Sequence, residues 1–198
     1  MHVKNMEISE IDPRAIPSWG LGYATSNRGA HHTPSFAPID FTNFSDELIL
    51  KMAGTTAVRN IRGTEGVPRL IVYLENFRAV SDSMETCMFL HRDLFMQPSD
   101  LIPLIQAVTG RTFNEQEFLK LGERIFCTER LFNLREGLTP AEDTLPKRYL
   151  SEALPEGPAE GAVCNLHPML EEYYSLRDWN LKSGYPSEGK LKELGLSI

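Results

Sequence analysis

The sequence is poor in cysteine and has no long apolar run. Only three of its 198 residues are cysteine, Cys87, Cys127 and Cys164, and they are widely spaced and odd in number. This is a poor disulfide framework and is typical of a reducing compartment. No apolar run approaches the roughly 20 residues that a membrane span needs, and the first residues lack the layout of a signal peptide. We therefore expect a soluble, cytoplasmic protein without a membrane partner.

Basic residues are also in the minority. Lysine and arginine number 20 against 27 aspartates and glutamates, which gives a net charge of -7. Because phosphate binding needs a basic face, this balance argues against a nucleic-acid partner. Hydrophobic residues make up 41% of the chain, which is long enough for one sizeable core without a second domain.

Strand-like alternation is almost absent, whereas helical periodicity recurs along the chain. The first forty residues are rich in Pro, Gly, Ser and Asn and are expected to form ordered loop and short helix. After them, helices are expected over residues 45–60, 70–88, 99–108, 114–136, 168–178 and 187–194. The sequence therefore predicts an all-α fold: a single irregular helical domain over 1–198, with a loop-rich segment at 1–43 and a helical body at 44–198.

The expected helix at 114–136 carries more charge than core-building requires. Asn114 and Glu117 provide a reciprocal N-cap, and Gly137 provides the stop. The apolar face of this helix consists of Phe118, Leu121, Ile125 and Phe132. Most of its remaining polar residues are expected on a solvated, weakly stabilising face: Glu123, Arg124, Glu129, Arg130, Asn133, Arg135 and Glu136.

The order of the amino acids at residues 122–148 is more informative than their charge. It reads GERIFCTERLFNLREGLTPAEDTLPKR. It resembles, nearly residue for residue, a segment from the C-terminal domain of the aldehyde ferredoxin oxidoreductase family, the tungsten-pterin enzymes that oxidise aldehydes to acids. Other blocks resemble this family in the same order: DPR at 12–14, YATSNRGA at 23–30, DSMETC at 82–87, and the chain from LEEYY at 170–174 to LKELGL at 191–196. The resemblance spans almost the whole chain and implies the helical fold of that domain.

The DSMETC block resembles the family's pterin-and-cluster motif. The resemblance implies that Asp82 binds a pterin, since a carboxylate can accept hydrogen bonds from the pterin N–H groups. It also implies that Cys87 is a metal ligand of a [4Fe-4S] cluster beside the pterin. In the family a glycine and then a leucine usually precede the cysteine, whereas this chain has Glu85 and Thr86.

The spacing of Asp82 and Cys87 leaves two arrangements open. The two residues are five positions apart, so on a continuous helix their side chains point about 140° from each other. Either they touch two different groups, or the helix ends between them and the chain turns. Cys87 also lies on the apolar stripe that begins at Leu70, so a buried core position is the alternative to a ligand.

The pair His31-His32 follows the Arg-Gly-Ala step of the second block. In the resembling family a histidine here reaches the tungsten pocket, and the resemblance implies that His32 is the catalytic residue that polarises or protonates the aldehyde oxygen. Solvated loop histidines are the alternative, and a metal pair ranks lower because no carboxylate or cysteine nearby has ligand-like spacing. Asn27 and Arg28 are expected to shape the same loop by hydrogen bonding.

The resemblance also implies cofactors and partners. The cofactors are a tungsten or molybdenum bis-pyranopterin and a [4Fe-4S] cluster, of whose four cysteine ligands only Cys87 matches the family in this chain. The remaining N-terminal and middle domains, in the same chain or as a partner subunit, would supply the other ligands. A small aldehyde would be the substrate and ferredoxin the electron acceptor. Assembly of the protein into a homo-oligomer is left open. We expect no catalysis from this chain alone.

Two other function classes remain open. One is a non-catalytic helical scaffold that kept the fold and lost the cofactor site, for which Glu85 and Thr86 are the supporting features. The other is a cysteine hydrolase that uses Cys87 and His32, which requires a depressed thiol pKa and an oxyanion hole.

Overall fold

The computed structural model describes residues 1–93 and 96–196, which form a helical structure with one small hairpin. The hairpin pairs β1 (His2–Val3) with β2 (Met6–Glu7) in antiparallel register. The all-α prediction is confirmed. The helices are α1 (Pro17–Thr25), α2 (Asp46–Ala53), α3 (Val67–Ser83), α4 (Met88–Asp93), α5 (Pro98–Thr109), α6 (Glu115–Arg135), α7 (Lys147–Ser151), α8 (Leu166–Arg177) and α9 (Glu188–Leu194), with short 3₁₀ turns η1 (Thr56–Arg59) and η2 (Pro140–Glu142).

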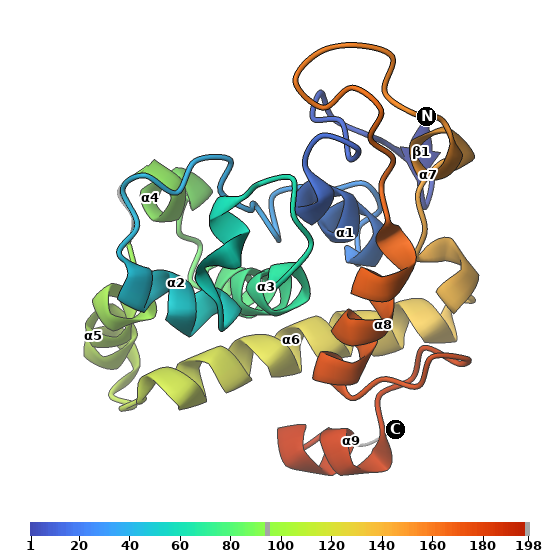
Figure 1. The fold of residues 1–198 in the computed structure, drawn as a ribbon. Coiled ribbons are helices and arrows are strands. Elements are labelled where there is room, and N and C mark those ends of the chain that lie inside the picture. Colours follow the sequence, from blue (N-terminus) through green and yellow to red (C-terminus); the bar gives the residue numbers. More distant parts are fainter. Residues whose placement is uncertain (94–95, 197–198) are drawn as a thin grey trace.

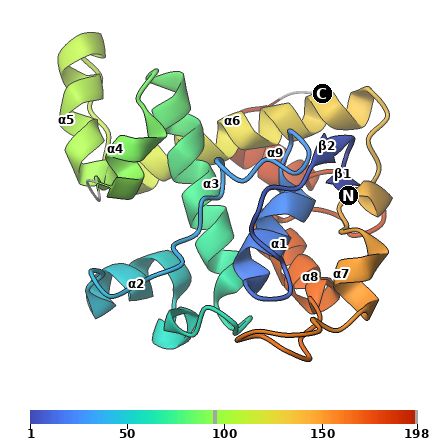
Figure 2. The ribbon, with the colours of Figure 1, turned by 90° about the horizontal axis from the view of Figure 1, so that it is seen from above.

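Helix α6 runs across the whole molecule and organises the other elements (Figure 1). Helices α4 and α5 lie near its N-terminal half, whereas α1, α7 and α8 gather near its C-terminal half, and α3 crosses it (Figure 2). The crossing of α3 and α6 is very close: a Cβ built on Gly122 of α6 would lie 1.8 Å from the carbonyl oxygen of Asn76 in α3. Glycine at this position is therefore what lets the two backbones touch.

Helix α1 lies at the centre of the core, although it belongs to the loop-rich segment. All nine of its residues are buried, so its sequence shows no amphipathic period. Its Leu21 and Tyr23 belong to the main hydrophobic cluster together with Ile71 of α3 and Tyr173 of α8. The core thus joins residues from both parts of the chain. No helix within the described ranges combines the length and apolarity that crossing a bilayer requires.

The expected helix at 45–60 is shorter in the structure. Its start is confirmed, since the Ser45 hydroxyl accepts a hydrogen bond from the Leu48 N–H at 3.2 Å. The helix ends at Ala53, because Gly54 takes a left-handed conformation with φ 73° and its N–H donates to the Leu50 carbonyl. The continuation to residue 60 is therefore wrong, and η1 replaces it.

The expected helix at 70–88 also ends early, at Ser83. The Glu85 N–H donates to the Asp82 carbonyl and the Thr86 N–H to the Ser81 carbonyl, at 3.0 and 3.1 Å. This is a Schellman ending, and Glu85 occupies its left-handed position with φ 56°. Glycine is the usual residue at this position, so a glutamate there does not signal a helix end. The prediction of one continuous helix is therefore wrong. Cys87 lies beyond the end and is exposed, so its interpretation as a core residue is also wrong.

The strain at Glu85 gives a testable expectation. The left-handed conformation costs a residue with a Cβ roughly 1–2 kcal/mol, whereas glycine does not have this cost. We expect Glu85→Gly to raise the free energy of unfolding by about 1 kcal/mol, after the extra flexibility of glycine in the unfolded chain is subtracted. Urea unfolding of both proteins measures the difference. Glu85→Ala keeps the Cβ and is the control, so an equal gain in that variant would show that backbone strain is not the cause.

The expected helices at 99–108, 114–136, 168–178 and 187–194 are confirmed within two residues by α5, α6, α8 and α9, whereas no helix was expected at α4 or α7. Both hydrogen bonds of the expected N-cap of α6 are present, with Asn114 accepting from the Glu117 N–H at 2.9 Å and Glu117 accepting from the Asn114 N–H at 2.8 Å. Two residues of α6 differ from expectation. Phe132 is 55% exposed, and the guanidinium of Arg135 covers its ring. Arg130, expected with the solvated charges, is fully buried.

Candidate functional site

A polar pocket of about 200 Å³ lies where the loop after α1 meets α3 and α6. It is lined by Asn27, Arg28, Pro34, Glu75, Arg78, Ala79, Asp82, Ser83, Ile125, Phe126 and Glu129. Asp82, the predicted pterin ligand, is therefore part of a hollow rather than of a flat surface. Arg78, one turn earlier on α3, holds the Asp82 carboxylate through an ion pair of 2.8 Å.

Two residues of the polar pocket carry buried polar atoms that have no hydrogen-bond partner among the described residues. They are the Oδ1 acceptor of Asn27 and the Nη1 donor of Arg78. A buried polar atom without a partner costs about 1–3 kcal/mol. Together with the acceptor oxygens of Asp82, these atoms match a ligand that offers both N–H donors and acceptor atoms, and the amino-pyrimidine edge of a pterin has this chemistry. The residues of the pocket therefore fit such a group.

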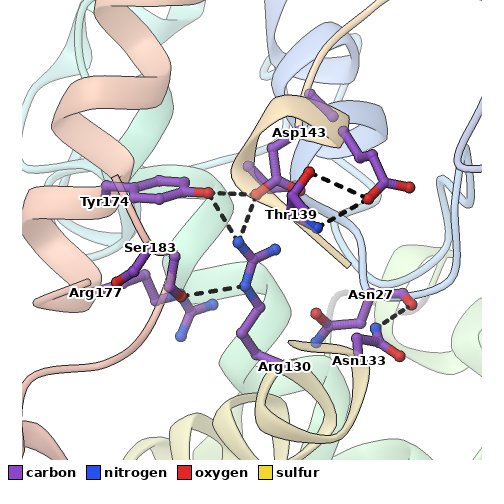
Figure 3. A network of polar contacts seen from close by, with 12 residues as sticks. Asn27, Arg130, Asn133, Thr139, Asp143, Tyr174, Arg177 and Ser183 are labelled. Atoms are coloured by element: carbon purple, nitrogen blue, oxygen red, sulfur yellow. Dashed lines mark hydrogen bonds and ion pairs between the residues drawn. The ribbon is translucent and has the colours of Figure 1, made fainter. Parts of the chain in front are cut away.

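Hydrogen bonds hold the loop after α1 onto α6, as expected for Asn27. Its side-chain Nδ2 donates to the Phe126 carbonyl at 3.1 Å, and its own carbonyl accepts from Asn133 at 2.8 Å (Figure 3). Arg28 pairs with Glu129 at 3.5 Å, and both side chains remain partly exposed. The loop is thus fixed at its base, and the charged rim above it remains accessible.

Cys87 follows the turn that ends α3 and is exposed. It lies near enough to Arg78 for its thiolate form to act on the guanidinium, as the Asp82 carboxylate does. Burial is the largest influence on this guanidinium and lowers its pKa, while Asp82 and Cys87 raise it. The helix ends between Asp82 and Cys87 and the chain turns, as one of the two arrangements requires. Whether the two side chains also touch different groups stays a prediction.

The two histidines have different environments. The ring of His32 stacks on Trp19 with centroids 5.3 Å apart and lies 5.8 Å from Phe36. His31 contacts Thr33 through Nε2 at 2.9 Å, and burial, followed by the nearby charge of Arg28, lowers its pKa. The half-buried positions of both rings show that neither is a freely solvated loop side chain. The catalytic role of His32 stays a prediction.

A buried cluster of charges underlies the C-terminal half of α6. Arg130 extends from the helix between Asp143 and Tyr174 (Figure 3) and pairs with Asp143 at 2.8 Å. Lys4, from the hairpin turn, pairs with the other oxygen of Asp143 at 2.6 Å, and the Tyr174 hydroxyl donates to the same carboxylate. All of these groups are buried and face one another, so the cluster has a structural role.

The three cysteines differ in burial, and two of them lie in the interior. Burial raises the pKa of the Cys127 thiol to about 11 and that of the Cys164 thiol to about 12, so both stay protonated near neutral pH. No group of three or more His, Cys, Asp or Glu side chains in the described part of the chain is arranged to hold a metal ion. Cys87, in contrast, is exposed.

Sequence reasoning missed Arg78, although it contacts Asp82 and lines the same pocket. The signal that was present is the spacing of the pair, since opposite charges four positions apart on a helix lie on one face. It did not stand out because most such pairs are solvated. The placement of Arg78 under the loop after α1 depends on how α1 packs on α3.

Comparisons with known proteins agree with the geometry. The family model described as "Aldehyde ferredoxin oxidoreductase, domains 2 & 3" matches residues 1–196. The tungsten-containing aldehyde ferredoxin oxidoreductase of Pyrococcus horikoshii is 38% identical over 99% of this chain, and that of Pyrococcus furiosus is 36% identical over all of it. The chain spans 30% and 31% of the length of these two relatives.

A solved structure shares the fold. The active site complex BamBC of benzoyl coenzyme A reductase in complex with 1,5-dienoyl-CoA superimposes with a TM-score of 0.66 at 19% identity, over 96% of this chain and 31% of that one. At this identity the likeness concerns the fold alone. The match to the family model and the identity to the tungsten enzymes extend over nearly every residue described above. The chain therefore belongs to the aldehyde ferredoxin oxidoreductase family, whose model for domains 2 and 3 matches residues 1–196.

Proposed function

We propose that this chain is the C-terminal portion of a tungsten-pterin, iron-sulfur oxidoreductase that converts aldehydes to carboxylic acids and passes the electrons to ferredoxin. The observation that carries the proposal is the placement of the DSMETC block. Asp82 lines a polar pocket with unpartnered acceptor and donor atoms, and the chain then turns to present an exposed Cys87. Relatives that match nearly the whole chain are named tungsten-containing aldehyde ferredoxin oxidoreductases.

The proposed enzyme needs parts that this chain does not provide. Because the chain spans about 30% of its relatives, we propose that N-terminal and middle domains, in cis or as a partner subunit, supply the rest of the pterin site and three cysteines. Residues 1–198 then act as one helical domain closing the site, and this domain alone is inactive. When bound, the tungsten-pterin group and the cluster supply the oxidation of aldehyde and water to acid, two protons and two electrons.

Three residues of this chain would contact the cofactors and the substrate. Asp82, whose carboxylate the ion pair to Arg78 holds in place, would accept hydrogen bonds from the pterin N–H groups. Cys87 would ligate the cluster from the exposed turn. His32, fixed by stacking on Trp19, would donate a hydrogen bond to the aldehyde oxygen as negative charge develops there.

The proposal is tested on protein purified anaerobically from its native host, by measuring intact mass, iron and tungsten on one sample. We expect iron and tungsten together with a larger mass or a co-purifying subunit. A lone chain of 22.4 kDa without metal would instead support the non-catalytic scaffold. Labelling of Cys87 in that metal-free chain much faster than labelling of an unactivated cysteine thiol at neutral pH would support the hydrolase.

The ligand role of Cys87 has its own test. In the native protein we expect Cys87→Ser to abolish the cluster signal and lower activity by more than about 100-fold. Even replacing a residue that only hydrogen-bonds to a metal ligand lowers metal affinity or activity by roughly 10–100-fold. Iron analysis and electron paramagnetic resonance measure the effect. Cys127→Ser is the matched control, since the thiol of Cys127 is buried and protonated and its iron content should not change. Unchanged iron in Cys87→Ser would remove the ligand assignment.

A further inference from the structure

The turn of the N-terminal hairpin carries an unusual residue. Lys4 and Asn5 lie between β1 and β2, and both have positive φ, 47° and 65°. Hairpin turns of this kind prefer asparagine, aspartate or glycine, so Asn5 suits its place whereas Lys4 does not. The Lys4 side chain is also only 7% exposed. A lysine that is both buried and held in an unfavourable conformation indicates a specific role.

Three oxygen atoms surround the Lys4 ammonium. It forms an ion pair with Asp143 at 2.6 Å, and it donates to the carbonyls of Ala24 at 2.6 Å and of Ser26 at 2.9 Å. Both carbonyls lie at the C-terminal end of α1, where helix carbonyls lack partners within the helix and a positive charge is favourable. Lys4 therefore ties the hairpin to the end of α1, while Asp143 balances its charge.

The Ser26 carbonyl belongs to the peptide unit that leads into Asn27. Asn27 lines the polar pocket, and its Oδ1 atom is buried there without a hydrogen-bond partner in the described part of the chain. The Ser26 hydroxyl accepts a hydrogen bond from the Arg28 N–H at 3.2 Å. Lys4 thus fixes the orientation of the peptide unit from which the pocket-lining part of the loop begins.

The hairpin also packs directly on the next part of this loop, beside α1 (Figure 2). A Cβ built on Gly29 would lie 2.7 Å from the Cβ of Met6 and 2.9 Å from the carbonyl oxygen of Val3. Gly29 has φ 82°, and its carbonyl accepts a hydrogen bond from the His31 N–H at 2.6 Å. The hairpin therefore covers the loop just before His31 and His32.

We infer that Lys4 is a positioning residue for the proposed site: it holds the loop after α1 so that Asn27 lines the polar pocket and His32 keeps its place. The inference rests on the proposed function and adds a residue that contacts neither cofactor nor substrate. When Lys4 is replaced, Asp143 still has Arg130 as its counter-ion at 2.8 Å. The effect of Lys4 on the loop can therefore be separated from a general loss of stability.

Lys4→Met tests the inference in the native protein, because methionine keeps most of the volume and removes the donors. We expect the amides of residues 26–32 to exchange with deuterium at least about tenfold faster, since two hydrogen bonds that oppose opening of the loop are lost. We also expect kcat per bound tungsten to fall at least about tenfold with little change in KM, because misplacing a group by about 1 Å can lower a rate roughly 100-fold. A general loss of stability would leave kcat per bound tungsten unchanged.

Lys190→Met is the matched control. Lys190 is also largely buried, with 12% of its side chain exposed, and it pairs with Glu123 at 3.1 Å and with Glu193 at 3.0 Å. It extends from α9, so exchange at residues 26–32 and kcat per bound tungsten should match the wild type. Wild-type exchange at 26–32 in Lys4→Met, or the same increase in Lys190→Met, would overturn the inference.

A second pair of variants covers the case in which Lys4→Met does not fold. Gly29→Ala places a Cβ against the hairpin and should raise exchange at residues 26–32 in the same way. Gly161 has nearly the same φ, 80°, but nothing in the described part of the chain lies within 4 Å of a Cβ built there. Gly161→Ala therefore has the same backbone strain without the contact. Equal exchange at 26–32 in these two variants would show that the hairpin does not hold the loop.

Exchange and turnover together separate the inference from the proposed function. Faster exchange at 26–32 in Lys4→Met, in a protein that oxidises no aldehyde, would refute the function and leave Lys4 as the residue that holds the loop. Aldehyde oxidation with an unchanged kcat per bound tungsten in Lys4→Met would leave the function standing and overturn the positioning role, whether or not exchange is faster.

Discussion

Replacing Asp143 by alanine is expected to cost about 3–5 kcal/mol of the free energy of unfolding. Asp143 is the shared counter-ion of Arg130 and Lys4, and the side chains of Arg130 and Asp143 are both 0% exposed. Its removal leaves two buried cations without a carboxylate, and it also removes the acceptor of the Tyr174 hydroxyl. Urea unfolding followed by circular dichroism measures the loss.

An exposed ion pair provides the control for Asp143→Ala. Asp46 pairs with Arg59 at 2.6 Å, but its side chain is 71% exposed. Asp46→Ala should therefore cost less than about 1 kcal/mol, because exposed pairs contribute little. A triple variant that replaces Asp143, Arg130 and Lys4 by apolar residues should recover most of the stability lost in Asp143→Ala. Similar losses in Asp143→Ala and Asp46→Ala would show that the cluster is not desolvated as described.

Replacing Gly122 by alanine should have the second largest effect, a loss of about 3 kcal/mol in the free energy of unfolding. In the helix interior alanine is favoured over glycine by roughly 1 kcal/mol, so local propensity predicts the opposite sign. The new Cβ would lie 1.8 Å from the Asn76 carbonyl oxygen, and backbone on both sides cannot yield without separating α3 from α6. Because Asn76 and Glu75 are neighbours on α3, the separation also disturbs the wall of the polar pocket.

The matched control for Gly122→Ala is another glycine inside a helix. Gly189 lies in α9, is exposed, and a Cβ there would meet only the Ser187 hydroxyl at 3.5 Å. Gly189 is the second residue of α9, so Gly189→Ala should raise the free energy of unfolding by at most about 0.5–1 kcal/mol, the gain in a helix interior. Thermal unfolding of the two variants compares them directly, and the same sign for both would contradict the close crossing.

The candidate site shows how far sequence reasoning reaches. The DSMETC block drew attention to Asp82 and Cys87, and the structure puts Asp82 in the polar pocket and Cys87 on the exposed turn after α3. Their relation was left open because helix geometry alone allowed two arrangements. In the structure Glu85 takes a left-handed conformation, which ends α3 before Cys87. A glutamate gives no sequence signal for this, since residues other than glycine rarely adopt it.

Local signals determined most helix starts and stops. Ser45, Asn114 and Gly137 act within three or four positions along the chain, and a hydrogen bond of that range does not depend on the rest of the fold. The motifs of the family are likewise a property of the sequence. The all-α class and the membership in the family followed from these features alone.

Burial was decided only by the tertiary structure. Arg130 and Phe132 are two positions apart on α6, yet the charged residue is buried and the aromatic one is exposed. Helical periodicity states which residues share a face, but not which face another element covers. Here η2 and α8 bring Asp143 and Tyr174 over Arg130, which makes its burial favourable. Phe132 stays 55% exposed, and Arg135 of the same helix lies over its ring. The polar pocket has the same origin, because its wall comes from segments far apart in the sequence whose packing no local pattern describes.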